Sequence, residues 1–172
     1  MKNQYIFYPK MNIDIDKMRL VVMRNLNKPI FGLASHHRKV EDEPYLVEFR
    51  EQYPFFSEIY NIFPTPAGYK VPIHLDHSRP CALNIPIDYT ADSHTIFYDV
   101  GDSPSFQRIH ERVYDTVTSE ATEVFRFTLT QPVIMNTSIP HGVIGGPKRA
   151  RIILSWSVSM DTSYEELRKL YG

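Results

Sequence analysis

The segment YKVPIHLDHSRPCALNIPI, residues 69–87, decides the expected fold. Its halves, residues 69–76 and 80–87, are short runs rich in β-branched residues and parted by polar residues and Pro80, which is typical of strands. The chain continues in the same way in four more segments: HTIFYDV (94–100), TEVFRFTLT (122–130), PVIMNT (132–137) and ARIILSWSV (150–158). Six short strands within about 90 residues predict a mainly β sandwich or barrel, because βαβ units would need long helical crossovers between them.

The N-terminal third is predicted to support this barrel. The segments QYIFYP (4–9) and MRLVVMR (18–24) are interpreted as two further strands. In residues 43–63, apolar side chains near helical spacing predict two short helices, divided at Pro54.

Two more helices are expected later in the chain. Residues 103–117 place apolar side chains at helical spacing, which predicts a helix inserted between strands. Residues 161–172 predict a short C-terminal amphipathic helix with Asp161 or Ser163 as its N-cap.

Length and composition limit the class of protein. With 172 residues, we expect a single domain over 1–172, with a support region of about 1–63 and a barrel core of about 64–160. Its 19 basic residues against 20 acidic ones offer no broad cationic field, which argues against nucleic acid as a partner. The lone cysteine, Cys81, suits a reducing compartment, and no apolar run is long enough to span a membrane. The start MKNQYIFYPK lacks the apolar region of a secretory signal, so a cytoplasmic location is expected.

The residues that carry chemistry lie at strand ends. His74 and Asp76 are two apart at the end of a predicted strand, so their side chains project from the same face. His141 follows 67 residues after His74, again just after a strand. Two imidazoles and one carboxylate form the ligand set of non-haem iron(II), which leaves metal positions open for other ligands. We therefore predict that these three residues bind a metal.

An arginine follows ten residues after His141. Arg151 opens the strand 151–158, where alternation puts it on the same face as Ser155. A guanidinium with a nearby hydroxyl is suited to binding a carboxylate inside a barrel. Arg149 is a competitor on the same face, but it lies in the turn GGPKRA (145–150), so Arg151 is the preferred anchor.

Three further polar residues are candidates around the cofactor. Asn84 is expected to face the barrel interior, where it either contacts a bound cofactor or a ligand, or is satisfied by a neighbouring backbone group. Tyr98 and Tyr89 are candidate phenol donors in the same region.

The remaining histidines are poorer candidates for ligation. His36 and His37 are expected in a solvated loop, and His110 on the exposed side of the inserted helix. His77 and Arg79 are expected at the mouth of the barrel, where they could meet a substrate.

Taken in order, HLD (74–76), IPHGV (139–143) and RIILS (151–155) resemble the iron(II)- and 2-oxoglutarate-dependent oxygenases. The spacing from His141 to Arg151 is similar to that of the prolyl hydroxylase and aspartyl/asparaginyl β-hydroxylase branches. The resemblance implies a double-stranded β-helix, a jelly-roll or cupin-like barrel, with short N-terminal helices bracing it. It also implies Fe(II), 2-oxoglutarate and O2 as cofactor and co-substrates, with Arg151, Ser155, Asn84 and Tyr98 on the cofactor side.

The implied activity is hydroxylation of a C–H bond with release of succinate and CO2. The charge balance favours an amino acid or a protein side chain as substrate. Two alternatives on the same barrel stay open, a cupin-like metal-binding protein without 2-oxoglutarate and a non-catalytic binding module. The sequence has no Gly-x-Ser-x-Gly motif and no glycine-rich phosphate loop, so it supports neither a serine hydrolase nor a nucleotide-binding protein.

Overall fold

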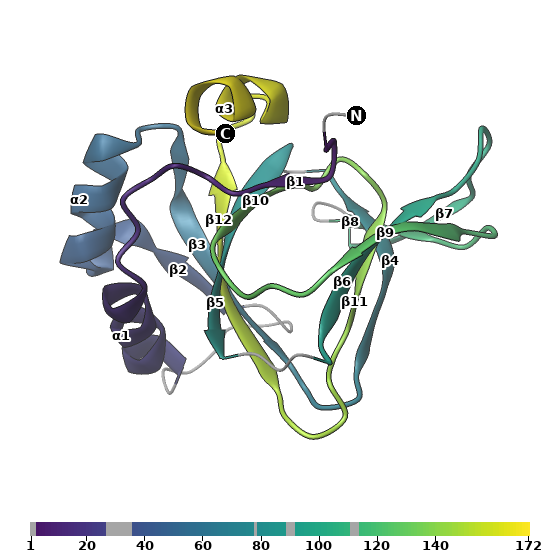
Figure 1. Cartoon of the computed structure of the whole chain (residues 1–172), viewed down its shortest axis with the longest axis horizontal. Coiled ribbons are helices and arrows are strands. Elements are labelled where there is room, and N and C mark those ends of the chain that lie inside the picture. Colours follow the sequence, from purple (N-terminus) through teal and green to yellow (C-terminus); the bar gives the residue numbers. More distant parts are fainter. Residues whose placement is uncertain (1–2, 27–35, 78, 89–91, 111–113) are drawn as a thin grey trace.

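The computed structural model describes residues 3–26, 36–77, 79–88, 92–110 and 114–172. Within them, two six-stranded antiparallel sheets lie face to face (Figure 1). Sheet I has the order β1 (Ile6–Phe7), β10 (Val133–Asn136), β5 (Cys81–Asp88), β12 (Arg151–Val158), β3 (Phe56–Thr65) and β2 (His36–Lys39). Sheet II has the order β7 (Phe106–His110), β8 (Tyr114–Val117), β4 (Lys70–Asp76), β11 (His141–Ile144), β6 (His94–Asp99) and β9 (Thr122–Phe127). The mainly β, jelly-roll class predicted from the sequence is confirmed, including all six strands of the barrel core.

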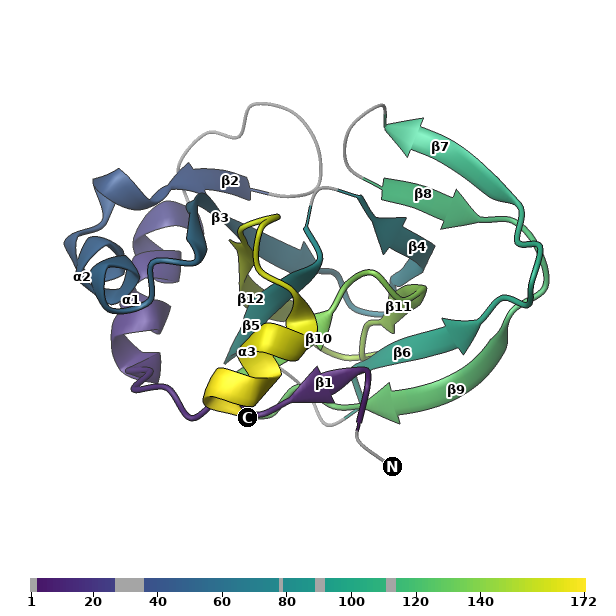
Figure 2. The ribbon, with the colours of Figure 1, turned by 90° about the horizontal axis from the view of Figure 1, so that it is seen from above.

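Helices cover the outer face of sheet I. The helices α1 (Ile15–Leu26) and α2 (Pro44–Gln52) lie on that side, with the 3-10 turn η1 (Val40–Asp42) before α2 (Figures 1 and 2). The C-terminal helix α3 (Tyr164–Tyr171) packs near β10. Between helices and sheet lies the main hydrophobic core, centred on the fully buried side chains of Trp156, Tyr60 and Leu154. None of the helices in the described residues is long and apolar enough to cross a membrane.

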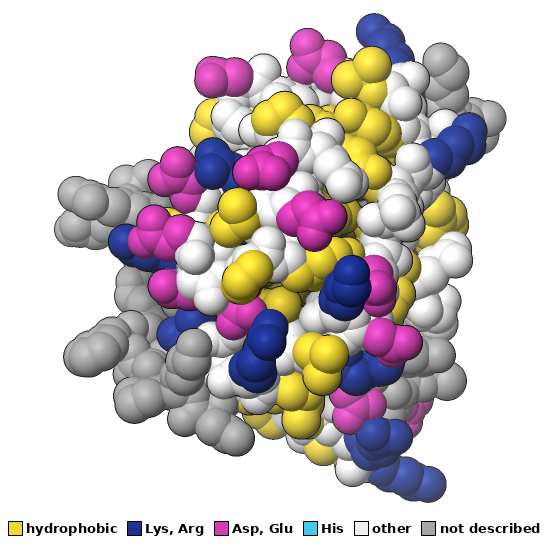
Figure 3. Space-filling view, turned by 90° about the vertical axis from the view of Figure 1, so that its left-hand side faces the viewer, with side chains coloured by type: hydrophobic (Ala, Val, Ile, Leu, Met, Phe, Trp, Pro, Cys, Tyr) yellow, Lys and Arg dark blue, Asp and Glu magenta, His cyan; other side chains and the backbone are white. Residues whose placement is uncertain are grey.

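The outer face of these helices carries charges of both signs. Figure 3 shows Lys and Arg side chains interspersed with Asp and Glu side chains on this side of the molecule. Leu20 and Met23 of α1 are exposed there, at 60% and 55% of their surface.

Two predictions in the N-terminal third are wrong. Residues 18–24 belong to helix α1 instead of a strand, because the buried residues Met18, Val21, Val22 and Asn25 recur at helical spacing. In residues 43–63, α2 is confirmed, but Phe56 begins β3 and not a second helix. The valines of α1 were interpreted as alternating strand residues, and the apolar residues of β3 as residues at helical spacing.

Two later predictions are also corrected. Where the structure describes residues 103–117, it shows no inserted helix: β7 and β8 pair there as antiparallel strands, with Phe106 opposite Val117. His36 and His37 lie in β2, paired with β3, and not in a loop. The C-terminal helix is confirmed, and Ser163 is its N-cap in a capping box with Glu166. The predicted strand 4–9 is confirmed only as the two-residue β1.

The space between the two sheets has an apolar part and a polar part. One part is filled by a second apolar cluster in which Tyr5 stacks on Phe125 at 5.0 Å and lies 5.1 Å from Phe97. The neighbouring part holds buried polar side chains from both sheets, namely Asn61, Asn84, Ser155, Arg151, Thr95, Asp76 and His141. Because buried polar groups need partners, this polar part of the interior is the candidate functional site.

Candidate metal centre

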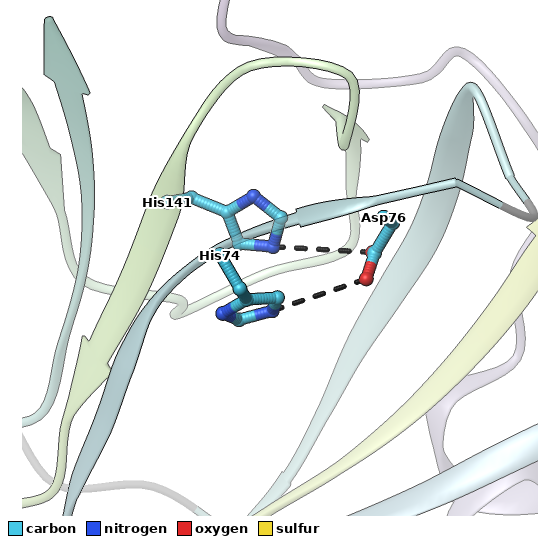
Figure 4. A group of neighbouring side chains, drawn as sticks. All are labelled: His74, Asp76 and His141. Carbon is cyan, nitrogen blue, oxygen red and sulfur yellow. Dashed lines mark ion pairs between the residues drawn. The ribbon is translucent and has the colours of Figure 1, made fainter. Parts of the chain in front are cut away.

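The pairing of two neighbouring strands brings the three predicted ligands together. His74 and Asp76 project from the same face of β4, and β11 pairs with β4 so that His141 lies directly opposite His74. Figure 4 shows both imidazoles turned toward the Asp76 carboxylate. One ligand atom from each residue can be chosen so that all three lie within 4.8 Å of one another. This separation leaves room for one ion between them.

The tautomers of both imidazoles follow from their hydrogen bonds. His74 Nδ1 lies 2.8 Å from the carbonyl oxygen of Pro72, and His141 Nδ1 lies 2.9 Å from that of Ile139. A carbonyl only accepts, so Nδ1 carries the proton in each ring and Nε2 keeps its lone pair. Each Nε2 lies 3.9 Å from an oxygen of Asp76. Both rings therefore present the nitrogen that a metal needs.

Burial and neighbouring charges shift the pKa values of His141 and Asp76. Loss of water around His141, together with His74 beside it, lowers its pKa to about 3, so the ring is neutral at physiological pH. Burial by itself would raise the pKa of the Asp76 carboxyl, but Arg79 and the two histidines outweigh it and lower the pKa below its ordinary value. The site thus combines two imidazoles with one carboxylate, a donor set that fits non-haem iron(II).

A glycine permits the close approach of β11 to β4. A Cβ at Gly142 would lie 3.0 Å from the Val71 carbonyl oxygen. The register between the two strands also shifts between His141 and Val143. The residue after His141 therefore has to be small for His141 to stay opposite His74.

Arg79 lies inside the site and not at its mouth, where the sequence analysis expected it. Its Nε donates to Asp76 Oδ2 at 2.7 Å, and its Nη1 donates to Ser155 Oγ at 2.9 Å. Sequence reasoning missed this contact, because residues 77–80 follow the end of β4, where strand alternation no longer fixes the direction of a side chain.

Arg151 projects into the interior from sheet I. It is 4% exposed, and its Nη1 donates to Thr95 Oγ1 of sheet II at 2.9 Å. Among the described residues it has no acidic partner, and its Nε has no hydrogen-bond partner. Burial lowers its pKa to about 10, which leaves it charged at neutral pH. A buried guanidinium with an unused donor fits a ligand that brings a carboxylate.

Arg149, the competing candidate for the carboxylate anchor, forms an ion pair at the surface. Its Nη2 donates to both carboxylate oxygens of Asp88, at 2.7 and 2.8 Å, and its side chain is 61% exposed. Arg149 is therefore not brought into the interior.

The other predicted cofactor residues have different surroundings. Ser155 is buried but accepts a hydrogen bond from Arg79. Asn84 is the cross-strand neighbour of Ser155 and donates to the sulfur of Met135 at 3.7 Å, so no backbone partner satisfies it in the part of the chain described. Asn61 flanks Ser155 on the other side, and its buried amide oxygen has no hydrogen-bond partner.

Tyr98 is not brought to the metal centre. Phe97 faces inward, with its ring 5.9 Å from that of His141, so the alternation of β6 turns Tyr98 to the opposite face. There it lies opposite Glu123, and burial together with Glu123 raises its pKa. Tyr89 lies outside the described residues.

The remaining candidates lie away from the ligands. His77 Nε2 lies 2.7 Å from Asp115 Oδ2, and its side chain is half exposed. Cys81 is buried in the main core, where burial raises its pKa to about 12 and keeps it a thiol. His110 is the last residue of β7.

Comparison with known proteins supports the fold. No protein-family model matches the sequence, and no curated protein matches it. AviO1 from Streptomyces viridochromogenes Tue57 is 13% identical, with 89% of both chains covered and a TM-score of 0.50. EvdMO1 is 11% identical, with 89% of this chain and 47% of that chain covered, at a TM-score of 0.51. A Pseudomonas putida prolyl-4-hydroxylase is 10% identical, with 90% of this chain and 91% of that chain covered, at a TM-score of 0.47.

The chain spans about a third of the length, 32%, of the vicilins from Corylus avellana and Solanum melongena that it also matches. At these identities, the likeness to AviO1 and EvdMO1 establishes a shared fold and nothing further. The function has to be argued from the site itself.

Proposed function

We propose that the chain is an iron(II)- and 2-oxoglutarate-dependent dioxygenase that hydroxylates a C–H bond of an amino acid or a protein side chain. One observation carries the proposal: a His-Asp-His group shares one interior with a buried arginine that has no acidic partner among the described residues. The first is a ligand set for iron(II), and the second is a receptor for a carboxylate.

Each residue has a defined role in this scheme. His74, Asp76 and His141 would hold Fe(II) through the two Nε2 atoms and the carboxylate. Arg151, itself held by Thr95, would bind the distal carboxylate of 2-oxoglutarate. When bound, iron and 2-oxoglutarate supply the oxidising chemistry, in which O2 oxidises both the co-substrate, to succinate and CO2, and the substrate C–H bond, to an alcohol.

The chain's own residues also keep the site dry. The aromatic cluster around Phe97 excludes water from one side of His141, and the core of sheet I closes the site from behind. Exclusion of water strengthens the interaction of Arg151 with an anionic ligand, because the local dielectric is low. Asn61 and Asn84 offer uncharged hydrogen-bonding groups in the same interior.

The charge of the chain supports the substrate class. Nucleic-acid binding depends on clustered Lys and Arg side chains, and here 19 basic residues are balanced by 20 acidic ones. The interior arginines are already engaged, Arg79 by Asp76 and Arg151 by the proposed co-substrate. A cytoplasmic location is part of the proposal and is supported by the single buried cysteine.

The alternative is a cupin-like metal protein or a binding module without 2-oxoglutarate. The same three ligands would bind a metal in that case, but the buried Arg151, which has no acidic partner in the described part of the chain, would have no role. Arg151 therefore favours the oxygenase.

Succinate formation tests the proposal. The protein is loaded anaerobically with Fe(II), supplied with 2-oxoglutarate and O2, and presented with amino acids, peptide pools and oligonucleotides in parallel. We expect substrate-dependent succinate with an amino acid or peptide, and none with the His141→Ala protein. Turnover with oligonucleotides alone would overturn the substrate class, and metal binding without any 2-oxoglutarate binding would favour the cupin-like alternative.

A further inference from the structure

We propose that Arg79 is a positioning residue for the metal centre, which holds the Asp76 carboxylate in the orientation that metal binding needs. It does so by joining Asp76, on sheet II, to Ser155, on sheet I. The inference rests on the proposed function in one respect, since it requires that His74, Asp76 and His141 bind a metal.

The guanidinium of Arg79 is fixed on three sides. Its Nε donates to Asp76 Oδ2 at 2.7 Å and its Nη1 donates to Ser155 Oγ at 2.9 Å. Its central carbon lies 5.5 Å from the centre of the Phe63 ring. The side chains of Arg79 and Asp76 are 13% and 4% exposed, so solvent competes little with their bond.

The backbone of Arg79 is fixed as well. Thr137 Oγ1 donates to the carbonyl oxygen of Arg79 at 2.6 Å, and the amide of Thr137 donates to Pro80 at 3.2 Å. The amide of Asp76 in turn donates to the carbonyl of Thr137 at 3.3 Å. Thr137 thus holds the backbone of both Asp76 and Arg79, which fixes the point from which the guanidinium extends.

Asp76 depends on this contact. Among the described residues, Arg79 provides the only donor within hydrogen-bond distance of its carboxylate, because each histidine Nε2 is 3.9 Å away. A buried carboxylate without a hydrogen-bond partner would be free to rotate. Arg79 therefore keeps the ligand oriented while the metal enters.

A substrate-binding role for Arg79 fits the contacts less well. Arg151, the proposed carboxylate anchor, has no acidic partner among the described residues, and its Nε donor is unused. Arg79 has the opposite arrangement, since its Nε is already bonded to a carboxylate. Mutation of a residue that hydrogen-bonds to a metal ligand typically lowers metal affinity by about 10–100-fold.

Cobalt(II) binding to the metal-free protein tests the inference. Its dissociation constant is measured by competition with a chelator, and its visible absorption is recorded, for the native protein and for Arg79→Ala, Arg79→Lys, Arg149→Ala and His141→Ala. We expect Arg79→Ala to weaken binding about tenfold or more and to change the absorption. Arg79→Lys, which keeps the charge but cannot bridge both partners, should fall between. Arg149→Ala removes an arginine with an equally short carboxylate contact, 2.7 Å, outside the site, and should match the native protein.

Rescue separates positioning from folding. Added guanidinium chloride, at a concentration well below denaturation, should fill the space left in Arg79→Ala and restore part of the cobalt affinity. Native-like affinity and absorption in a folded Arg79→Ala protein would overturn the inference. A loss of affinity that guanidinium does not reverse would also overturn it, since Arg79 would then support only the fold. If native protein and His141→Ala bind cobalt equally, the proposed function itself fails, and the inference falls with it.

Discussion

Arg151 of sheet I and Thr95 of sheet II are joined across the interior by a 2.9 Å hydrogen bond from the guanidinium Nη1 to the hydroxyl oxygen. The bond fixes the arginine at a depth where water does not compete, since both residues are at least nine-tenths buried. It leaves the Nε donor of Arg151 unused. The guanidinium is therefore held in place with one donor still available to a ligand.

Arg151→Ala should weaken 2-oxoglutarate binding by tens- to thousands-fold. The loss of a buried charge-assisted pair costs on the order of 2–5 kcal/mol. Arg149→Ala is the matched control, because its arginine pairs with Asp88 at the surface. Anaerobic titration of each metal-loaded protein with 2-oxoglutarate gives the affinities. Equal affinities in the two variants would move the carboxylate anchor elsewhere.

His141→Ala should abolish stoichiometric metal binding while the protein stays folded. Removal of a ligand itself should cost more than the roughly 10–100-fold loss typical of a partner behind a ligand. His77→Ala is a matched control, because His77 is half exposed and contacts Asp115 instead of the site. Metal content after gel filtration, measured alongside circular dichroism, checks the outcome. Full metal content in His141→Ala would refute the ligand assignment.

The metal-free protein should lose stability as pH falls below about 6.5. Burial depresses the His141 pKa from 6.5 to about 3, so the unfolded chain takes up a proton that the folded chain does not. The contribution of neutral His141 to the free energy of unfolding is therefore fully present above 6.5, its pKa in the unfolded chain. It is lost as pH falls toward 3, its pKa in the folded chain. Between pH 6.5 and 5.5 the loss is on the order of 1 kcal/mol.

His141→Gln removes this titration and provides the control. Denaturant unfolding of both proteins over the same pH range measures the free energies of unfolding. The difference between them should shrink as pH falls. A pH-independent difference would mean that His141 is not buried as a neutral ring.

Gly142→Ala should destabilise the protein by about 1–3 kcal/mol and weaken metal binding. Its new methyl group would lie 3.0 Å from the Val71 carbonyl oxygen and push His141 away from His74. Gly145→Ala is the matched comparison on the same segment. Its methyl group would lie 2.6 Å from the Pro66 carbonyl oxygen, so it should destabilise more but affect metal binding less. Thermal unfolding and cobalt titration separate the two effects.

Features set by local alternation could be predicted from the sequence. The six core strands were found, and the two-residue spacing of His74 and Asp76 placed their side chains on one face, as the structure has them. The sequence favoured Arg151, which opens a strand, over Arg149, which lies in a turn, and the structure buries Arg151 and exposes Arg149.

Features set by packing between distant segments could not be predicted. Val21 and Val22 favoured a strand by type, but burial against sheet I decided for a helix. The helical spacing in residues 103–117 was coincidental, since β8 pairs with β4 as well as with β7. Thr95 and Ser155 acquire their roles from partners 56 and 76 residues away, a distance over which local patterns carry no information.

The distribution of the site over two sheets also bears on how the domain assembles. His74, Asp76 and His141 belong to neighbouring strands of one sheet, so the pairing of β4 with β11 is enough to gather all three ligands. Arg151 belongs to the other sheet and meets Thr95 only when the two sheets have closed. The three metal ligands are therefore gathered by local strand pairing, whereas the contacts of Arg151 with Thr95 and of Arg79 with Ser155 form only when the two sheets meet.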